Sequence, residues 1–172
     1  ITNNTALEGG GIRGYFFSDD TLSLNNCTIS GNTATSGNGG GISSTGVSDD
    51  NDAIQTLIDC TISDNTALTY GGGISCDDYS NPTLTGCTIT DNAATYGGGI
   101  DCRFSDAKLS GCMITGNTAT SGSGGGIYFK NSSDSMLEDC TITANTATYG
   151  GGIDCLNGSN PTLTDCVISD NA

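Results

Sequence analysis

Short runs of alternating apolar and polar residues recur along the whole chain. The runs Cys87-Thr88-Ile89-Thr90 and Cys140-Thr141-Ile142-Thr143 each place cysteine and isoleucine on one side of an extended backbone and threonine on the other. Glycine makes up 27 of the 172 residues, and Thr, Ser, Asn and Asp are frequent in every segment. Helix interiors disfavour that mixture. The pattern therefore predicts β-strands whose cysteines and isoleucines point inward and whose threonines point outward.

Two phrases divide the chain into repeats. A glycine triplet followed by isoleucine alternates with a second phrase, in which a hydrophobic residue is followed three positions later by asparagine. The isoleucines that close the first phrase are Ile12, Ile42, Ile74, Ile100, Ile127 and Ile153. They are 30, 32, 26, 27 and 26 residues apart, in the range of units that must stack to bury a hydrophobic face. We therefore interpret residues 1–172 as a single repeat array.

Each repeat contains three short strand-like runs. In one unit they are Ile74-Ser75-Cys76, the run around Thr83-Leu84-Thr85, and Cys87-Thr88-Ile89. Three such strands and three corners account for the length of one repeat, which predicts an all-β parallel β-helix, or β-solenoid, of about six coils. Parallel stacking spaces equivalent positions by ~4.8 Å, so six coils rise roughly 29 Å.

The two repeated phrases are expected to form corners of each coil. Stacked asparagine side chains can bond to the backbone and to one another along the stack, and we assign this structural ladder to Asn32, Asn65, Asn92, Asn117, Asn145 and Asn171. The glycine triplets mark another corner, where a positive φ or a close backbone approach excludes a side chain. A phosphate-binding role is disfavoured because phosphate loops open helices.

Charge narrows the choice of partners. Four Lys and Arg against 19 Asp and Glu give a formal charge of -15, and histidine is absent. Nucleic acid is a poor partner because phosphate binding needs cations. No run of 18 apolar residues indicates a membrane span in this segment, and no export leader precedes Ile1. Because both ends lack a capping element, we expect this array to be a fragment or subunit of a longer solenoid.

Nine cysteines fall at regular positions. Six lie two residues before the isoleucine of the asparagine phrase: Cys27, Cys60, Cys87, Cys112, Cys140 and Cys166. Cys76, Cys102 and Cys155 follow a GGGI isoleucine by two residues, and each occurs in a repeat that also has the first cysteine. This co-occurrence predicts disulfides within a coil: Cys76–Cys87, Cys102–Cys112 and Cys155–Cys166. Cys27 and Cys60 can also pair between coils. The alternative is that all nine are small buried apolar residues, because connectivity does not follow from sequence.

A longer period lies within the short one. The segment from Tyr70 to Cys87 recurs 79 residues later, from Tyr149 to Cys166. A block of about three coils therefore looks duplicated, which is the growth pattern of long arrays and favours a stalk, sheath or fibre.

The alternation of GGGI with IxxN resembles the GGA(I/L/V) and FxxN repeats of the polymorphic outer-membrane proteins, which are autotransporter adhesins of intracellular bacterial pathogens. This chain has Gly in place of Ala and Ile in place of Phe. It also resembles the wider class of cysteine-bearing right-handed β-helix repeats in large surface proteins. The resemblance covers essentially all 172 residues. It implies a right-handed β-helix and a secreted or surface-displayed passenger, located outside the cell or on its surface, and it brings no catalytic residues.

The favoured function is structural, either an extracellular adhesin stalk or a filament subunit. Unpaired strand edges invite pairing, so we expect end-to-end self-association, with a host or environmental glycan or surface as a further partner. We expect no enzymatic activity and no cofactor. An alternative is a polysaccharide-binding or polysaccharide-cleaving enzyme, since Asp101 and Asp154 share an outward position roughly 9.6 Å apart, near the limit for an inverting carboxylate pair. Outward charges are, however, usually just solvated.

Two further alternatives rest on surface chemistry. Outward hydroxyl groups at Thr28/Ser30, Thr61/Ser63, Thr88/Thr90, Thr141/Thr143 and Ser169 form the kind of two-column array that orders water in ice-binding proteins, although Met113 and Val167 interrupt it. Calcium is a candidate ligand of acidic loops, because hard cations favour oxygen ligands. The candidate ligands are Asp49, Asp50, Asp52, Asp77 and Asp78.

Overall fold

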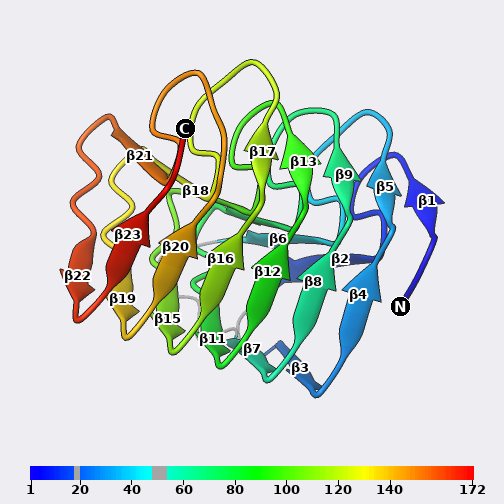
Figure 1. The fold of residues 1–172 in the computed structure, drawn as a ribbon. Helices are drawn as coiled ribbons and strands as arrows, with labels where there is room; N and C mark the ends of the chain where they lie inside the picture. Colours follow the sequence, from blue (N-terminus) through cyan, green and yellow to red (C-terminus); the bar gives the residue numbers. More distant parts are fainter. Residues whose placement is uncertain (18–19, 48–53) are drawn as a thin grey trace.

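The computed structural model describes residues 1–17, 20–47 and 54–172 of the chain. These residues form a solenoid of parallel strands without helices, and its coils lie side by side along one axis from the blue N-terminal strands to the red C-terminal strands (Figure 1). The described part therefore contains no helix of the length and apolar character needed to cross a membrane. The predicted all-β, stacked-coil architecture is confirmed.

Four parallel sheets run along the solenoid, three with six strands and one with five. Sheet C follows the glycine corner and contains β2 (Ile12–Phe16), β6 (Ile42–Gly46), β10 (Ile74–Asp77), β14 (Ile100–Arg103), β18 (Ile127–Lys130) and β21 (Ile153–Leu156). Sheet D comes next along each coil and contains β3 (Thr21–Asn25), β7 (Ile54–Ile58), β11 (Thr83–Thr85), β15 (Lys108–Ser110), β19 (Met136–Glu138) and β22 (Thr162–Thr164).

Sheet A carries the cysteine-isoleucine runs, and sheet B follows the asparagine corner. Sheet A contains β4 (Thr28–Ser30), β8 (Thr61–Ser63), β12 (Thr88–Thr90), β16 (Met113–Thr115), β20 (Thr141–Thr143) and β23 (Val167–Ser169). Sheet B contains the two-residue strands β1 (Thr5–Ala6), β5 (Thr33–Ala34), β9 (Thr66–Ala67), β13 (Ala93–Ala94) and β17 (Thr118–Ala119). The sequence predicts the first three sheets. It does not predict sheet B, because Thr-Ala pairs are too short to show alternation.

Equivalent residues of successive coils lie in register. Ile89 pairs with Ile62 on one side and with Ile114 on the other, and the same holds for the leucines of sheet D. The core is therefore a set of columns in which each isoleucine, leucine or cysteine packs on its equivalent above and below. Ile89 is 0% exposed and Leu84 is 1% exposed, so the predicted inward face is the buried one.

The asparagine corner forms a continuous ladder, which is buried from Asn32 to Asn145. The backbone N–H and side-chain Nδ2 of Asn92 both donate to Oδ1 of Asn117 at 3.0 Å, and Nδ2 also donates to the carbonyl oxygen of Ile62 at 2.9 Å. The same pattern repeats from Asn4 through the six predicted asparagines to Asn171. Each side chain thus satisfies a corner whose backbone would otherwise lack partners.

Two glycines of each triplet meet different structural requirements, a positive φ at the first and a close backbone contact at the second. Gly97, the first of its triplet, has a φ of 60°, where residues with a Cβ are strained. Gly98, the second, leaves no room for a side chain, since a Cβ there would lie 2.5 Å from the carbonyl carbon of Thr118 in the next coil. The close approach predicted for this corner is therefore present at Gly98, whereas the positive φ belongs to its neighbour.

A second column of positive φ values precedes the ladder asparagines, and one member of it is an alanine. Glycine, aspartate or asparagine occupies this position in the other coils, but Ala144 has a φ of 56°. An alanine with a positive φ is strained by about 1–2 kcal/mol relative to glycine. Replacing it with glycine removes this strain, but part of the gain is lost because glycine has more conformational freedom in the unfolded chain.

We expect Ala144→Gly to stabilise the protein by about 0.5–1 kcal/mol for this reason. Chemical denaturation should show a higher midpoint with an unchanged slope. Ala147→Gly is the matched control, because Ala147 has no positive φ and gains only unfolded-state freedom; it should lower stability. Equal effects of both substitutions would contradict the strain assigned to Ala144.

Candidate functional site

A polar and aromatic cluster lies on the outer face of sheet C. Ser75 and Asp101 point outward from neighbouring strands, yet they are 1% and 0% exposed. Tyr128 is the in-register neighbour of Asp101 on the next coil and is 3% exposed. Its ring stacks on that of Tyr96 at 5.6 Å between centroids, and Tyr96 stacks on Tyr70 at 5.2 Å. The three stacked tyrosine rings thus form a packed layer outside sheet C that spans three coils.

Arg103 contacts two carboxylates and one tyrosine ring in this layer. Its Nε donates to Oδ2 of Asp101 at 2.9 Å, and its Nη2 lies 2.8 Å from Oδ2 of Asp77. Its guanidinium carbon lies 4.0 Å from the ring centroid of Tyr70, a cation–π geometry. Ser75 adds a hydroxyl hydrogen bond to the same Asp101 oxygen at 3.2 Å. The second carboxylate oxygen of Asp101 is buried without a hydrogen-bond partner in the described structure.

Burial dominates the ionisation of Asp101. Removal from water disfavours the charged form, and it raises the pKa of Asp101 to about 7 although Arg103 acts in the opposite direction. Burial also raises the pKa of Asp77, again against the effect of Arg103, and that of Tyr128 to about 12. The cluster therefore holds a carboxyl group that takes up a proton near neutral pH.

This geometry corrects two expectations about Asp101 and Asp154. Asp101 is not a solvated outward charge but a fully buried one. Tyr128 is in register between Asp101 and Asp154, so its buried side chain occupies the coil that separates the two carboxylates. An inverting pair needs room for a water and a sugar between its carboxyl groups. The two aspartates therefore give no support to a polysaccharide-cleaving site.

The raised pKa of Asp101 predicts that the protein becomes more stable as the pH falls from 8 to 5. The folded state binds a proton that the unfolded state, with a pKa near 3.9, does not bind in this range. Stability therefore decreases as the pH rises from about 4 through about 7, and Asp77 contributes in the same direction. The expected change from Asp101 is on the order of a few kcal/mol.

Thermal unfolding as a function of pH measures this effect. Asp101→Asn should flatten the pH dependence, because asparagine keeps an oxygen for Arg103 and Ser75 but has no proton to gain. Asp139→Asn, at an exposed position with a φ of 51°, removes one acidic charge elsewhere and controls for the general relief of repulsion. If both variants keep the slope of the wild type, the role assigned to Asp101 is wrong.

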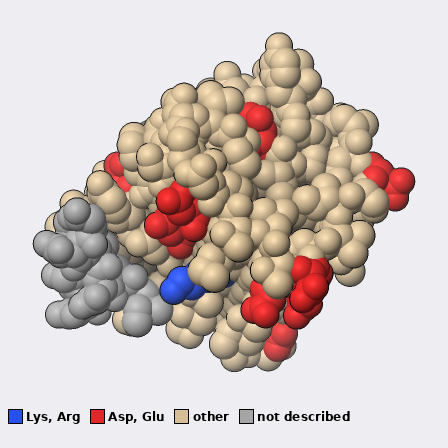
Figure 2. All heavy atoms as spheres, turned by 90° about the vertical axis from the view of Figure 1, so that its left-hand side faces the viewer, with Lys and Arg blue, Asp and Glu red and all other residues tan. Residues whose placement is uncertain are grey.

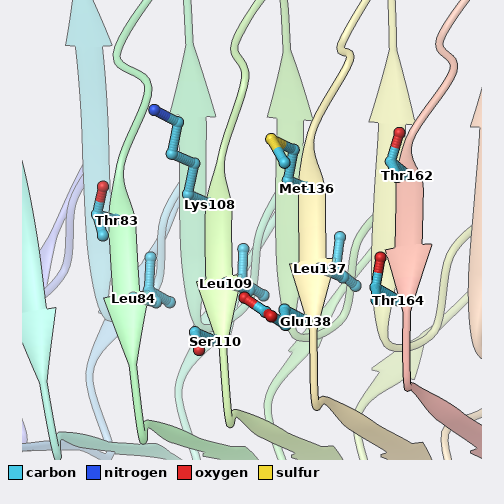
Figure 3. Close-up of a pocket in the computed structure, with 10 residues that line it drawn as sticks. All are labelled: Thr83, Leu84, Lys108, Leu109, Ser110, Met136, Leu137, Glu138, Thr162 and Thr164. Atoms are coloured by element: carbon cyan, nitrogen blue, oxygen red, sulfur yellow. The ribbon is translucent and has the colours of Figure 1, made fainter.

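A shallow groove of about 270 Å³ crosses the outer face of sheet D (Figure 3). One row of it consists of in-register Thr83, Lys108, Met136 and Thr162, and a second row includes Ser110, Glu138 and Thr164. The leucines between the rows form the buried floor. The sides therefore present hydroxyl groups, one ammonium, one carboxylate and the exposed thioether of Met136, which is 56% exposed. The sequence alone does not indicate this groove, because the rows form only after the coils stack.

The other predicted surface sites have the following positions. The threonine and serine columns lie on the outer face of sheet A, where Met113 and Val167 interrupt them, 48% and 54% exposed. The carboxylate of Asp77 forms an ion pair with Arg103, and Asp78 is exposed beside it.

The other calcium candidates, Asp49, Asp50 and Asp52, lie outside the described residues. No group of three or more Cys, Asp or Glu side chains converges as a metal site in the described part, and calcium binding stays a prediction.

All nine cysteines lie among the described residues, and each is a free thiol. The predicted within-coil pairs Cys76–Cys87, Cys102–Cys112 and Cys155–Cys166 are not formed in this structure. Equivalent cysteines of neighbouring coils lie beside each other instead: Cys76 pairs in register with Cys102. Stacking places repeated positions at the same point of each coil, so cysteines of one column become neighbours on adjacent strands.

Acidic side chains are distributed over separate parts of the surface. Figure 2 views the solenoid toward the end that carries β21–β23, and acidic groups on this face clearly exceed basic ones. This agrees with the formal charge of -15. The acidic groups are interrupted by neutral side chains rather than forming one continuous patch.

The family follows from the stacked coils together with the repeat pattern. A family model described as a right-handed beta helix region matches residues 45–172. The chain belongs to the right-handed β-helix family. A second model, the repeat of the Chlamydia polymorphic membrane protein, matches residues 26–45 of this right-handed β-helix protein. That segment contains one asparagine phrase and one glycine phrase. No curated protein and no solved structure matches the chain.

Proposed function

We propose that this right-handed β-helix protein is a stalk segment of a surface-exposed, adhesin-type protein. The observation that carries the proposal is the unbroken stacking of all coils. Backbone ladders run through six strands in sheets A, C and D, and the asparagine ladder runs beside them. Each added coil extends the same hydrogen bonds by ~4.8 Å, so coil number sets length. The match to a Chlamydia polymorphic membrane protein repeat supports a location at the cell surface.

The 79-residue duplication allows a direct test of the proposal that the number of coils sets the length of the stalk. Inserting a second copy of residues 70–148, which spans three coils, should lengthen the particle by roughly 14 Å without widening it. Small-angle scattering measures both dimensions. An insertion of equal length rich in Gly and Ser is the control, because it adds a flexible loop and no coils. A widened or unfolded particle with the three-coil insertion would contradict the stalk proposal.

We also propose that coil edges associate end to end. Within the described residues, β21, β22 and β23 pair on one side only, and such edges template further pairing. Light scattering over a concentration series should show growing rods. Cys155→Pro removes a backbone donor that faces the open edge of β21, because Ile127 and Asn131, on either side of its in-register equivalent, donate to the next coil. It should suppress growth, whereas Cys155→Ala should not. A wild-type protein that stays monomeric throughout would reject end-to-end association.

The sheet D groove favours a second function, the binding of an extended glycan. Its rows repeat hydroxyl and charged groups at the spacing of the coils, and its open shape suits a chain rather than a compact ligand. Removing a charged hydrogen-bonding group costs about 1.5–3 kcal/mol, so Glu138→Ala should weaken binding at least about tenfold. A panel of neutral and acidic glycans measures this, with Thr61→Ala on sheet A as the control. No binding by the wild type would reject this function.

A further inference from the structure

Two aromatic residues have a strained backbone conformation at the corner between sheets C and D. Phe104 directly follows β14 and has a φ of 51°, and Tyr79 lies one coil earlier, two residues after β10, with a φ of 62°. A positive φ is unfavourable for residues with a Cβ, and for a bulky side chain it is a clear outlier. Tyr79 is 40% exposed and Phe104 is 47% exposed, so packing in the core does not explain why they are there.

Other coils place residues that tolerate a positive φ at the same two corner positions. The position of Phe104 is occupied in other coils by Asp78, Asn131 and Asn157. The position of Tyr79 is occupied in later coils by Ser132 and Gly158. Glycine and short polar side chains adopt this conformation more readily than aromatic ones. The fold therefore does not require an aromatic residue here, and strained residues of this kind cluster at functional sites.

Tyr79 and Phe104 are neighbours across the stack. The N–H of Tyr79 donates to the carbonyl oxygen of Phe104 at 2.7 Å. The coil of Phe104 is one residue shorter at this corner, because Ser105 follows Phe104 directly, whereas Tyr79 stands between Asp78 and the stacked Ser80. Two exposed aromatic residues thus lie on adjacent coils, and adjoining exposed apolar side chains mark interaction sites.

Exposed carboxylates flank the aromatic pair. Asp78 directly precedes Tyr79, and Asp106 follows Phe104 by two residues; both aspartates are exposed. The Oδ1 atom of Asp106 accepts a hydrogen bond from the backbone N–H of Asp134 at 2.6 Å, and Asp134 is exposed as well. These carboxylates add negative charge beside aromatic rings whose faces are themselves electronegative.

The basic side chains of this region leave an excess of negative charge. The guanidinium group of Arg103 is already paired with Asp77 and Asp101, and Lys108 and Lys130 are fewer than the exposed aspartates of the corner. The whole chain has a formal charge of -15. The field of the protein therefore attracts a cationic partner and repels nucleic acid and anionic membranes.

We propose that Tyr79 and Phe104 form a docking site for an arginine-bearing segment of a basic partner protein. A guanidinium group stacks on the face of an aromatic ring and pairs with a carboxylate. Asp78 beside Tyr79 and Asp106 near Phe104 supply the carboxylates for both kinds of contact. Tyrosine and arginine are also enriched among the residues that dominate protein–protein binding energy. The site uses neither the coil edges nor the residues that line the sheet D groove, so it does not rest on the functions proposed above.

Replacing both aromatic residues with asparagine separates binding from folding. Asparagine tolerates a positive φ, so the double variant Tyr79→Asn/Phe104→Asn should keep or raise the denaturation midpoint while it weakens binding at least about tenfold. Tyr149→Asn is the matched control, because Tyr149 is 68% exposed and has no positive φ. It should leave the affinity unchanged.

The carboxylates are tested without altering the aromatic rings. Asp78→Asn/Asp106→Asn should weaken binding and make it less sensitive to salt, because fewer charges are screened. Asp139→Asn/Asp165→Asn removes the same number of exposed aspartates from other corners and should have a smaller effect. Equal effects of the two double variants would mean that the partner binds to the overall charge and not to this corner.

Fluorescence anisotropy with a synthetic peptide of alternating arginine and glycine measures the affinity, and a peptide with citrulline in place of arginine is the uncharged probe. We expect the arginine peptide to bind, more weakly as salt is added, and the citrulline peptide not to bind. The proposal is overturned if the arginine peptide does not bind, if both peptides bind equally, or if Tyr149→Asn lowers the affinity as much as the double aromatic variant. Binding of a neutral glycan that is lost in the double aromatic variant would also overturn it, because the corner would then recognise carbohydrate.

Discussion

Replacing Asn117 with alanine is expected to destabilise the protein by on the order of 3–5 kcal/mol, since several buried groups lose their partners together. The Oδ1 atom of Asn117 accepts from both the backbone and the side chain of Asn92 at 3.0 Å. Its Nδ2 donates to Asn145 and to the carbonyl oxygens of Ile89 and Thr115. Asn117 is 0% exposed, so water cannot replace these bonds without opening the corner.

Chemical denaturation gives the free energy of unfolding for this variant. Asn4→Ala is the matched control, because Asn4 occupies the same phrase in the first coil but is exposed and is bonded to the ladder on one side only. We expect it to cost less than half as much. Equal losses at the two positions would show that burial in the middle of the ladder adds nothing, contrary to the structure.

Gly98→Val is expected to have a comparably large effect, above about 4 kcal/mol. A Cβ at Gly98 would lie 2.5 Å from the carbonyl carbon of Thr118 and 2.6 Å from the carbonyl oxygen of Gly125. Both atoms are backbone atoms of the next coil, so relief requires the two coils to separate. The ladder bond from Gly98 to the carbonyl oxygen of Gly124 would then be lost as well.

Hydrogen exchange would show whether the coils on both sides of Gly98 open, and the unfolding midpoint gives the total cost. Gly111→Ala separates steric exclusion from backbone strain, because Gly111 has a φ of 60° and no atom within 4 Å of the added Cβ. It should cost only about 1–2 kcal/mol. A Gly98 variant no worse than this control would mean that the coils are not packed as closely as the structure indicates.

The asparagine ladder can be predicted from the sequence, whereas the environment of Asp101 cannot. The asparagine ladder was predictable because every coil repeats the same residue at the same point, and stacking has only one way to align them. The prediction of a solvated charge at Asp101 is wrong, because this side chain is fully buried. Alternation correctly placed it outward, but it gives no information about tyrosines from the glycine corner that pack over that face. The repeated tyrosine before the glycines, at Tyr70 and Tyr96, was the available signal.

The cysteines illustrate the same limit. Their co-occurrence within repeats suggested bonds inside a coil, whereas the structure places equivalent cysteines of neighbouring coils together, with Cys76 beside Cys102. A repeat pattern specifies which positions stack, but the distance across one coil depends on how the three walls close around the core. The groove of Lys108, Met136 and Glu138 likewise exists only as a surface of four stacked coils.

The sequence by itself determined the repeat length, the inward and outward faces, the asparagine and glycine corners and hence the parallel β-helix. These features follow from local periodicity and from residues whose backbone or hydrogen-bonding properties allow few other positions. Only the tertiary structure decided the burial of Asp101, the position of Tyr128 between Asp101 and Asp154, the fourth sheet and the surface groove. Those depend on contacts between residues about one coil or more apart, whose distances and solvent exposure are fixed only when the coils close and stack.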